Sequence, residues 1–359
     1  MIEIEVKTKR QHAYNIYIGQ AVLQEEKLLK DIFSSKQKLL ILTDKKVADL
    51  YLDSVMTQLR QYTNTVKSFI LPQGEEAKTL KVVEEVVAFL DENSYERQDA
   101  ILALGGGTVG DSAGFCASIY KRGMTLVHVP TTLLAQVDSS IGGKTAVNTR
   151  QGKNRIGTFY QPDAVLMDPL FLLSLDKTHY AQGFAEIIKY AASMDKELFT
   201  YLKQTPLVQI EKNMAWIIER CARHKAKIVS ADECDFGGRR VLNFGHSLAH
   251  AIELIWGYEA YSHGQAVAIG MYVTTKISEE KKLSKTGSAA EIKALLQKFD
   301  LPWQMPSTEA EKIVHILKND KKTQGNVLRE VIISEIGQAH IIQVPFAALD
   351  ELTALYCRG

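Results

Sequence analysis

Several histidines and one glutamate in the second half of the chain could together hold a divalent metal ion. His246 and His250 are four residues apart, which places them on one face of a helix, and His263 follows thirteen residues later. Upstream, Glu186 and Lys189 lie one helical turn apart. Imidazoles and a carboxylate are typical ligands of a catalytic metal that keeps open coordination positions. Because a serine follows His246, this is not an H-E-x-x-H site, and the histidine pair alone is equally compatible with two core or surface side chains.

A glycine-rich run could bind the phosphates of a nucleotide. Gly105–Asp111 follows the apolar run Ala100–Leu104 and precedes a helical pattern. Glycines let backbone N–H groups approach a pyrophosphate, which a helix N-terminus also attracts. The spacing differs from G-x-G-x-x-G, so a simple tight turn is the alternative. Asp44 ends an earlier strand and could bind a ribose, or it could only begin a helix.

Basic side chains accompany these motifs although the whole chain has a formal net charge of only +1. A cation beside glycines is usually solvated, but several in one pocket would bind a carboxylate and a phosphate at opposite ends of one substrate. The residues in question are Arg122, Lys144, Lys153, Lys189, Lys225 and Arg239.

The composition favours a soluble cytosolic protein of two domains. The chain has 359 residues, of which 46% are hydrophobic and 24% charged, which is enough apolar surface for two cores. The near-zero net charge argues against a nucleic acid or an anionic membrane as partner. Four scattered cysteines suit a reducing compartment. We expect neither a signal peptide nor a membrane span, since no apolar run reaches about 18 residues.

The hydrophobic pattern predicts an α/β domain followed by a mainly α-helical domain. Short apolar runs alternate with helical patterns in the first half, which indicates a parallel sheet with helices on its faces. We predict strands at 2–6, 14–18, 38–43, 66–71, 100–104 and 126–129 and a helix at 80–92. Helical spacing dominates later, at 180–193, 207–230, 247–254 and 265–281, with one short hairpin near 329–334. The expected domains are residues 1–175 and 176–359.

Six motifs, in this order and spacing, resemble the 3-dehydroquinate synthase family of sugar-phosphate cyclases over nearly the whole chain. They are Gly105–Ser112, Val137–Ala146, Gly183–Ala191, Asp232-Glu233, Leu242–Leu254 and His263–Tyr272. The resemblance implies that the first domain binds NAD and that the second binds a metal, zinc or cobalt, and the substrate.

The resemblance also implies roles for individual residues. The implied metal ligands are Glu186, His246 and His263. The implied NAD contacts are Asp44, Glu75, Lys78, Gly107, Thr108, Val109, Gly110, Asp111, Thr131, Thr132, Lys144, Lys153 and Ser174. The implied substrate and catalytic residues are Asp138, Lys144, Asn154, Lys189, Lys225, Arg239, Asn243, His250 and Lys321. Arg122 is expected to reach the phosphate in a neighbouring subunit, which implies a homodimer.

The reaction that the resemblance implies converts 3-deoxy-D-arabino-heptulosonate 7-phosphate to 3-dehydroquinate and phosphate, in the shikimate pathway to the aromatic amino acids. NAD oxidises a secondary alcohol for a time, phosphate leaves by β-elimination, the hydride returns, and an intramolecular aldol step closes the ring. The metal polarises that alcohol. The departing phosphate itself can act as the base, and His250 is the candidate relay for the alcohol proton.

Some positions depart from the family pattern, and other functions stay open. Ser247, Ala249, Gln265 and Lys45 replace residues commoner in the family, and Asp176–His179 replaces a Pro-x-Arg-Glu stretch, without removing an expected ligand. One alternative is another cyclase of this superfamily with a different sugar phosphate. A second is a metal-dependent polyol dehydrogenase that releases NADH, and a third is a non-enzymatic NAD- or metal-binding regulator.

Overall fold

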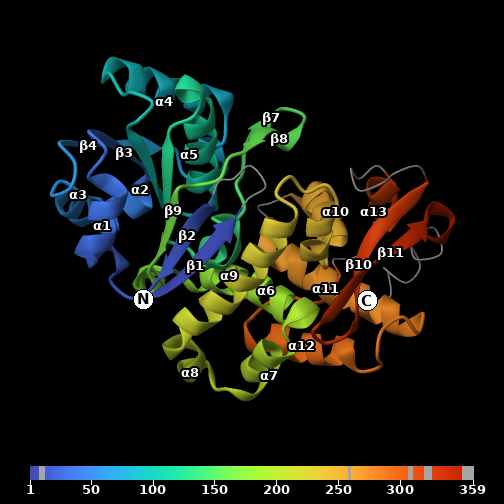
Figure 1. Ribbon diagram of the computed structural model, residues 1–359. Coiled ribbons are helices and arrows are strands. Elements are labelled where there is room, and N and C mark those ends of the chain that lie inside the picture. The colour runs from blue at the N-terminus through green and yellow to red at the C-terminus, as the bar shows by residue number, and fades with distance from the viewer. Residues whose placement is uncertain (8–12, 258–259, 306–309, 319–325, 350–359) are drawn as a thin grey trace. The chain divides into compact units, whose positions relative to one another are not determined.

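The computed structural model describes residues 1–7, 13–257, 260–305, 310–318 and 326–349 (Figure 1). The chain divides into two compact units. The first contains residues 1–175 and 225–234, and the second contains residues 176–224 and 235–359. Helix α9 (Met214–Ala231) therefore contributes its first part to the second unit and its last part to the first.

The first unit is built on a seven-stranded sheet that is parallel except at one edge. Its order is β1 (Ile2–Lys7), β2 (Ala13–Ile18), β9 (Ala164–Met167), β6 (Thr125–Pro130), β5 (Ala100–Gly105), β3 (Lys38–Asp44) and β4 (Thr65–Leu71). In this sheet, β1 and β2 pair antiparallel, and the other neighbouring strands pair parallel. From β3 the chain goes to β4 on one side, and β5 then lies on the other side of β3. The strand order thus reverses between β3 and β5.

Helices cover both faces of this sheet, which explains why its strands are continuously apolar. In β3, Leu39 and Ile41 join one buried cluster, while Leu40 and Leu42 join the other. Successive side chains of a strand point to opposite faces, so both faces must be dry. The helices of this unit are α1 (Glu26–Phe33), α2 (Lys45–Val47), α3 (Asp53–Leu59), α4 (Leu80–Glu92) and α5 (Gly107–Ile119).

A separate antiparallel hairpin in this unit was not predicted from the sequence. It consists of β7 (Lys144–Thr149) and β8 (Gly152–Phe159). The two strands are rich in polar residues and glycine and contain no apolar run, so hydrophobic periodicity gives no signal for them. The hairpin matters because it carries three of the expected site residues, Lys144, Lys153 and Asn154.

The second unit is mainly helical, and Figure 1 shows a hairpin of it, β10 and β11, beside α13. Its further elements are α6 (Lys177–Met194), α7 (Lys196–Gln204), α8 (Leu207–Lys212), α10 (His246–Trp256), α11 (His263–Glu280), α12 (Ser288–Lys298), α13 (Ala310–Lys318), β10 (Val327–Glu335) and β11 (Gln338–Pro345). The predicted helical region 207–230 is two helices, α8 and α9, separated at Asn213. The predicted hairpin near 329–334 is confirmed.

The departure from the family pattern at Asp176–His179 has a local structural role. Asp176 is the N-cap of α6, and its carboxylate accepts the backbone N–H of His179 at 3.0 Å. The ring Nδ1–H of His179 donates to the same carboxylate at 2.8 Å. The stretch therefore begins α6, the helix that carries Glu186, by a standard capping interaction.

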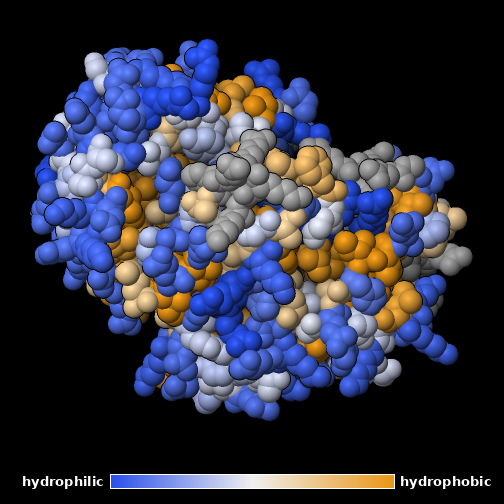
Figure 2. Space-filling model, viewed as in Figure 1, coloured by the Kyte–Doolittle hydropathy of each residue, from blue (hydrophilic) through white to orange (hydrophobic). Residues whose placement is uncertain are grey.

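The fold class predicted from the sequence is confirmed, namely an α/β part followed by a mainly helical part. In Figure 2 the visible face is covered mainly by hydrophilic residues with apolar ones between them. Among the described residues, the structure contains no helix with the length and hydropathy needed to cross a membrane.

Candidate active site

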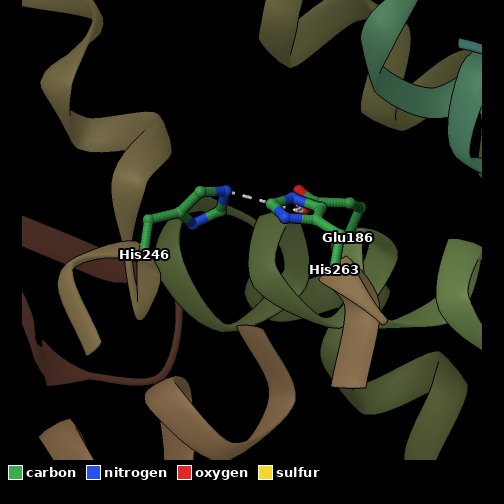
Figure 3. A group of neighbouring side chains, drawn as sticks. All are labelled: Glu186, His246 and His263. Atoms are coloured by element: carbon green, nitrogen blue, oxygen red, sulfur yellow. Dashed lines mark ion pairs between the residues drawn. The ribbon is translucent and has the colours of Figure 1, made fainter. Parts of the chain in front are cut away.

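Glu186, His246 and His263 converge on one point in the second unit (Figure 3). Glu186 comes from the middle of α6, while His246 and His263 are the first residues of α10 and α11. The Nε2 atoms of His246 and His263 lie 3.6 and 3.4 Å from Oε1 of Glu186. One ligand atom from each residue lies within 4.8 Å of the other two. Such spacing suits one shared metal ion.

The starts of α10 and α11 are positioned by tight local geometry. Gly245 precedes His246 with φ +75°, a conformation that favours glycine. A Cβ atom on Gly270 of α11 would lie 2.0 Å from the carbonyl oxygen of Gly245, so the two helices pack backbone against backbone. Helix α11 begins with a capping box in which Ser262 and Gln265 exchange side-chain and backbone hydrogen bonds. Both histidines are thus held by backbone packing and capping.

The second nitrogen of each imidazole is engaged away from Glu186. The Nδ1–H of His246 donates to the carbonyl oxygen of Phe244 at 3.1 Å, and that of His263 donates to Oε1 of Glu253 at 2.8 Å. A histidine that donates through Nδ1 keeps Nε2 for another partner. Both Nε2 atoms therefore face Glu186.

Burial and charge set the protonation of this group. Burial alone would raise the pKa of Glu186, but Lys189 and the two histidines outweigh it and hold that pKa well below its usual value. Burial, together with the cations at Lys189 and His263, lowers the pKa of His246 well below its usual value. Burial also acts to lower the pKa of His263, but hydrogen bonds to Glu186 and Glu253 raise it to about 10. At neutral pH the metal-free group therefore combines a carboxylate, a neutral imidazole and an imidazolium.

These residues fit a divalent metal by their chemistry. Two imidazole nitrogens and one carboxylate oxygen are a common three-residue set for catalytic zinc, which leaves room for a substrate oxygen. Glu186 is only 1% exposed, and a buried carboxylate needs a nearby cation. Lys189, 2% exposed and ion-paired with Glu186, supplies part of that charge. His250 follows one turn after His246, and their ring centroids lie 5.9 Å apart.

In the first unit, the glycine run lies where α/β sheets bind nucleotides. Gly105 ends β5 and Asp44 ends β3, the two strands between which the strand order reverses. Ligands bind outside the carboxyl ends of strands at such a reversal. A Cβ atom on Gly107 would lie 3.0 Å from Oγ of Ser139, so this turn has little room for a side chain. The run thus begins α5 with its backbone closely packed.

The sequence left two roles open for Asp44, binding a ribose or beginning a helix, and the structure shows that it begins a helix. Its carboxylate accepts the backbone N–H of Val47 at 3.0 Å and caps α2. Thr132 similarly accepts the N–H of Ala135 at 3.2 Å, and the N–H of Thr131 donates to the carbonyl of Gly105 at 3.0 Å. These contacts hold the loops beside β3 and β5, and they leave a role in ribose binding as a prediction.

A polar network joins several of the expected cofactor residues. Lys78, 4% exposed, donates to Oδ2 of Asp111 at 2.5 Å and to Oδ1 of Asn154 at 2.6 Å. Glu75 accepts from Lys153 at 2.8 Å and from the side chain of Asn148 at 2.7 Å. Burial alone would raise the pKa of Glu75, but these two hydrogen bonds and the nearby lysines lower it. The loop between β4 and α4, helix α5 and the β7–β8 hairpin are thereby linked.

The other expected site residues of the first unit lie at separate places. Lys225 donates to Oδ1 of Asp138 at 2.8 Å and to its backbone carbonyl at 2.6 Å. Ser174 accepts a hydrogen bond from the hydroxyl of Tyr51 at 2.5 Å. Lys144 is exposed at the start of β7, and Arg122 is exposed with φ +64°. Thr108, Val109 and Gly110 lie in the first turns of α5.

In the second unit, Arg239 is buried and Asn243 half-buried in the short helix Gly238–Asn243 that precedes His246. Lys321 lies outside the described residues. Glu253 was not singled out from the sequence, although it stands seven residues after His246 and three after His250. That spacing places the carboxylate on the same helical face as both histidines, which is the signal that could have found it.

Comparisons with known proteins agree with this geometry. The family models for the N-terminal and C-terminal domains of 3-dehydroquinate synthase match residues 68–182 and 183–323. The 3-dehydroquinate synthase of Streptococcus pneumoniae (strain JJA) is 44% identical over 333 residues, which are 92% of this chain and 94% of that protein.

Two solved structures of cyclases resemble the whole chain. One is 2-deoxy-scyllo-inosose synthase in complex with carbaglucose-6-phosphate, NAD⁺ and Co²⁺, with 25% identity, a TM-score of 0.86 and coverage of 98% of this chain and 99% of that one. The other is 2-epi-5-epi-valiolone synthase from Streptomyces hygroscopicus subsp. jinggangensis 5008 with NAD⁺ and Zn²⁺, with 27% identity, a TM-score of 0.85 and 99% of each chain covered. Together with the family models, these similarities show that the chain belongs to the 3-dehydroquinate synthase family.

Proposed function

We propose that this chain is a phosphate-eliminating cyclase that converts 3-deoxy-D-arabino-heptulosonate 7-phosphate to 3-dehydroquinate and phosphate. The observation that carries the proposal is the convergence of Glu186, His246 and His263 within motifs of the family. NAD and one divalent metal, zinc or cobalt, are the proposed cofactors. Both are bound by the two structural relatives described above.

The two cofactors would supply the redox chemistry. Glu186, His246 and His263 would hold the metal. When bound, the metal would supply a Lewis acid that makes the proton of a secondary alcohol easier to remove, and NAD⁺ would supply a hydride acceptor that is regenerated in each turnover and so is not consumed. The chain itself would hold these groups, orient the substrate and move one proton.

Residues of the first unit would hold NAD. The backbone N–H groups at the start of α5, from Gly107 to Asp111, would bind the pyrophosphate, since this helix begins directly after the glycine turn. The network of Glu75, Lys78 and Lys153 would orient neighbouring parts of the cofactor, because its side chains are already ordered by one another. Further contacts are proposed for Asp44, Thr131, Thr132, Lys144 and Ser174.

Basic and amide side chains would orient the substrate. Its carboxylate and its phosphate both need cations or hydrogen-bond donors. The proposed donors are Lys144, Asn154, Lys189, Lys225, Arg239, Asn243 and Lys321. The Asp138 carboxylate, which pairs with Lys225, would fix the direction of that ammonium. His250 would take the alcohol proton, because it lies one helical turn after His246 and an imidazole nitrogen can accept a proton.

One assay separates this reaction from its alternatives. Protein supplied with NAD, a divalent metal and the heptulosonate phosphate should release phosphate while NADH does not accumulate. Glucose 6-phosphate, offered in parallel, should release none if the substrate must carry a carboxylate. Steady NADH formation from simple polyols, without phosphate release, would contradict the cyclase function and favour a dehydrogenase. Phosphate release only from glucose 6-phosphate would favour another cyclase of the superfamily.

The proposed homodimer makes a separate prediction about Arg122. Two successive residues, Lys121 and Arg122, have positive φ, and Arg122 is exposed, so the backbone presents this guanidinium at the surface. If it reaches the phosphate of the partner's substrate, Arg122→Ala should lower turnover about 10–100-fold, the value of a lost charged hydrogen bond. An equal mixture of Arg122→Ala and His263→Ala subunits should then recover roughly a quarter of wild-type activity, since about half of the dimers contain one complete site.

The matched control is an equal mixture of His246→Ala and His263→Ala subunits. Both substitutions damage the same subunit's metal group, so no mixed dimer contains a complete site and no activity should return. Sedimentation equilibrium measures the oligomeric state directly. A monomer, or a mixture no more active than the mean of its two components, would contradict the role of Arg122 across an interface.

A further inference from the structure

Glu253 is a buried carboxylate directly behind one of the proposed metal ligands. It lies in the last turn of α10, its side chain is 4% exposed, and its Oε1 atom is 2.8 Å from Nδ1 of His263. Because a carboxylate accepts hydrogen bonds, Nδ1 must carry the hydrogen. Burying a carboxylate is unfavourable without such a partner, so this contact is specific and ordered.

We propose that Glu253 is a positioning residue for the metal, acting through His263. By accepting the Nδ1–H bond it fixes the ring orientation and keeps Nε2 directed at Oε1 of Glu186, 3.4 Å away. Its negative charge also makes the imidazole a stronger electron donor to a cation at Nε2. The inference rests on the proposed function, in which His263 is a metal ligand.

The two histidines differ in a way that supports this role. His246 has only a backbone carbonyl, that of Phe244, behind its Nδ1, and its side chain is 11% exposed. The side chain of His263 is 35% exposed, so less of its surface is packed against the protein than that of His246. A charged and buried acceptor therefore supports the histidine that packing constrains less.

The same helix serves both ligands. Glu253 lies two turns after His246 on α10, and His263 begins α11. Residues seven apart share a helical face, so α10 supplies one ligand from its first turn and orients the other from its last. The close backbone contact between Gly245 and Gly270 keeps the two helices at the distance that this arrangement needs.

A stabilising ion pair between α10 and α11 is the competing explanation, and metal binding distinguishes the two. We expect Glu253→Ala to weaken the affinity for Zn²⁺ or Co²⁺ about 10–100-fold in a chelator competition with the full-length protein. Glu253→Gln should bind metal better than the alanine variant, because its amide oxygen can accept the same hydrogen bond. The visible spectrum of bound Co²⁺ should resemble that of the wild type in the glutamine variant and change in the alanine variant.

The control is Glu279→Gln on α11, whose carboxylate accepts the N–H of Ala289 at 2.7 Å. This substitution removes a carboxylate from α11, the helix that carries His263, without changing a contact of His263. Metal affinity should therefore stay within about twofold of wild type. Circular dichroism of each metal-free variant gives its folded fraction, and the comparison uses the affinity of that fraction.

Three results would overturn the inference. Metal affinity of Glu253→Ala within twofold of wild type would show that Glu253 does not position His263. Glu253→Gln and Glu253→Ala could also lose metal affinity equally, to an extent that their lower folded fractions explain wholly. That result would show that Glu253 stabilises the fold and does not position His263. A wild-type protein that binds no metal would refute the proposed metal site, and this inference with it, whereas the first two results leave that site intact.

Discussion

His263→Ala is expected to remove the bound metal and to lower turnover by more than about 10³-fold, since a polarising metal contributes several kcal/mol to the transition state. The reason is geometric. The Nε2 atom of His263 is one of the three converging ligand atoms, so the variant would keep only the ligand atoms of Glu186 and His246. Metal content per chain and phosphate release should therefore fall together.

His340→Ala is the matched control for this prediction. His340 is exposed on β11, and the same change of residue type there should leave both metal content and turnover unchanged. The circular dichroism spectrum of His263→Ala should match that of metal-free wild-type protein, which separates loss of metal from loss of fold. Full turnover after complete removal of the metal would show that the triad is not the catalytic centre.

Asp195→Asn is expected to lower the free energy of unfolding by about 2–4 kcal/mol, because it breaks a buried charged network. Asp195 has a side chain only 2% exposed, and it accepts two hydrogen bonds from Arg220 and one from His224, each at 2.8 Å. It also caps α7 by accepting the N–H of Leu198 at 2.9 Å. Asparagine can keep the cap but not the charge, so the guanidinium of Arg220 would lose its buried anionic partner and keep only the exposed Glu197.

The pH dependence of this effect has a definite sign. Burial alone would raise the pKa of Asp195, but hydrogen bonds from His224, Arg220 and Leu198 hold it well below its usual value. A carboxyl group with a depressed folded-state pKa stabilises the protein above its unfolded pKa of about 3.9 and loses that contribution as the pH falls further. The difference in unfolding free energy between wild type and Asp195→Asn should therefore shrink as the pH falls below about pH 4.

Glu197→Gln provides the control, measured by the same urea titrations. Glu197 pairs with the same Arg220 at 3.0 Å, but its side chain is 73% exposed. Exposed ion pairs contribute little, so this variant should lose less than about 1 kcal/mol. If the two variants were equally destabilised, burial of Asp195 would not be the cause. Asp195 directly follows α6, the helix that carries Glu186. The turnover of folded Asp195→Asn protein therefore tests separately whether the contacts of Asp195 affect the position of Glu186.

The sequence predicted much of the fold because the signals were local. The continuous apolar runs of β3 and β5 arise from burial on both faces, and the glycines after β5 follow from the tight turn into α5. The hairpin of β7 and β8 gave no comparable signal, since its pairing depends on the surrounding residues and not on an apolar pattern. The strand prediction therefore missed the β7–β8 hairpin, which lacks an apolar run, and it also missed the short apolar strand β9.

For the site, the sequence by itself determined which chemistry was available. The family motifs indicated Glu186, His246 and His263 as candidate metal ligands. Spacing along the chain alone left His250 as an equally good candidate ligand. The tertiary structure decided which Nε2 atoms meet Glu186, and it assigned to Glu253 a place behind His263. The physical reason is that these contacts join α6 to α10 and α11, which lie far from it in the sequence, and only helix packing brings the ligand atoms together. The close approach of Gly245 and Gly270 sets the packing of α10 on α11.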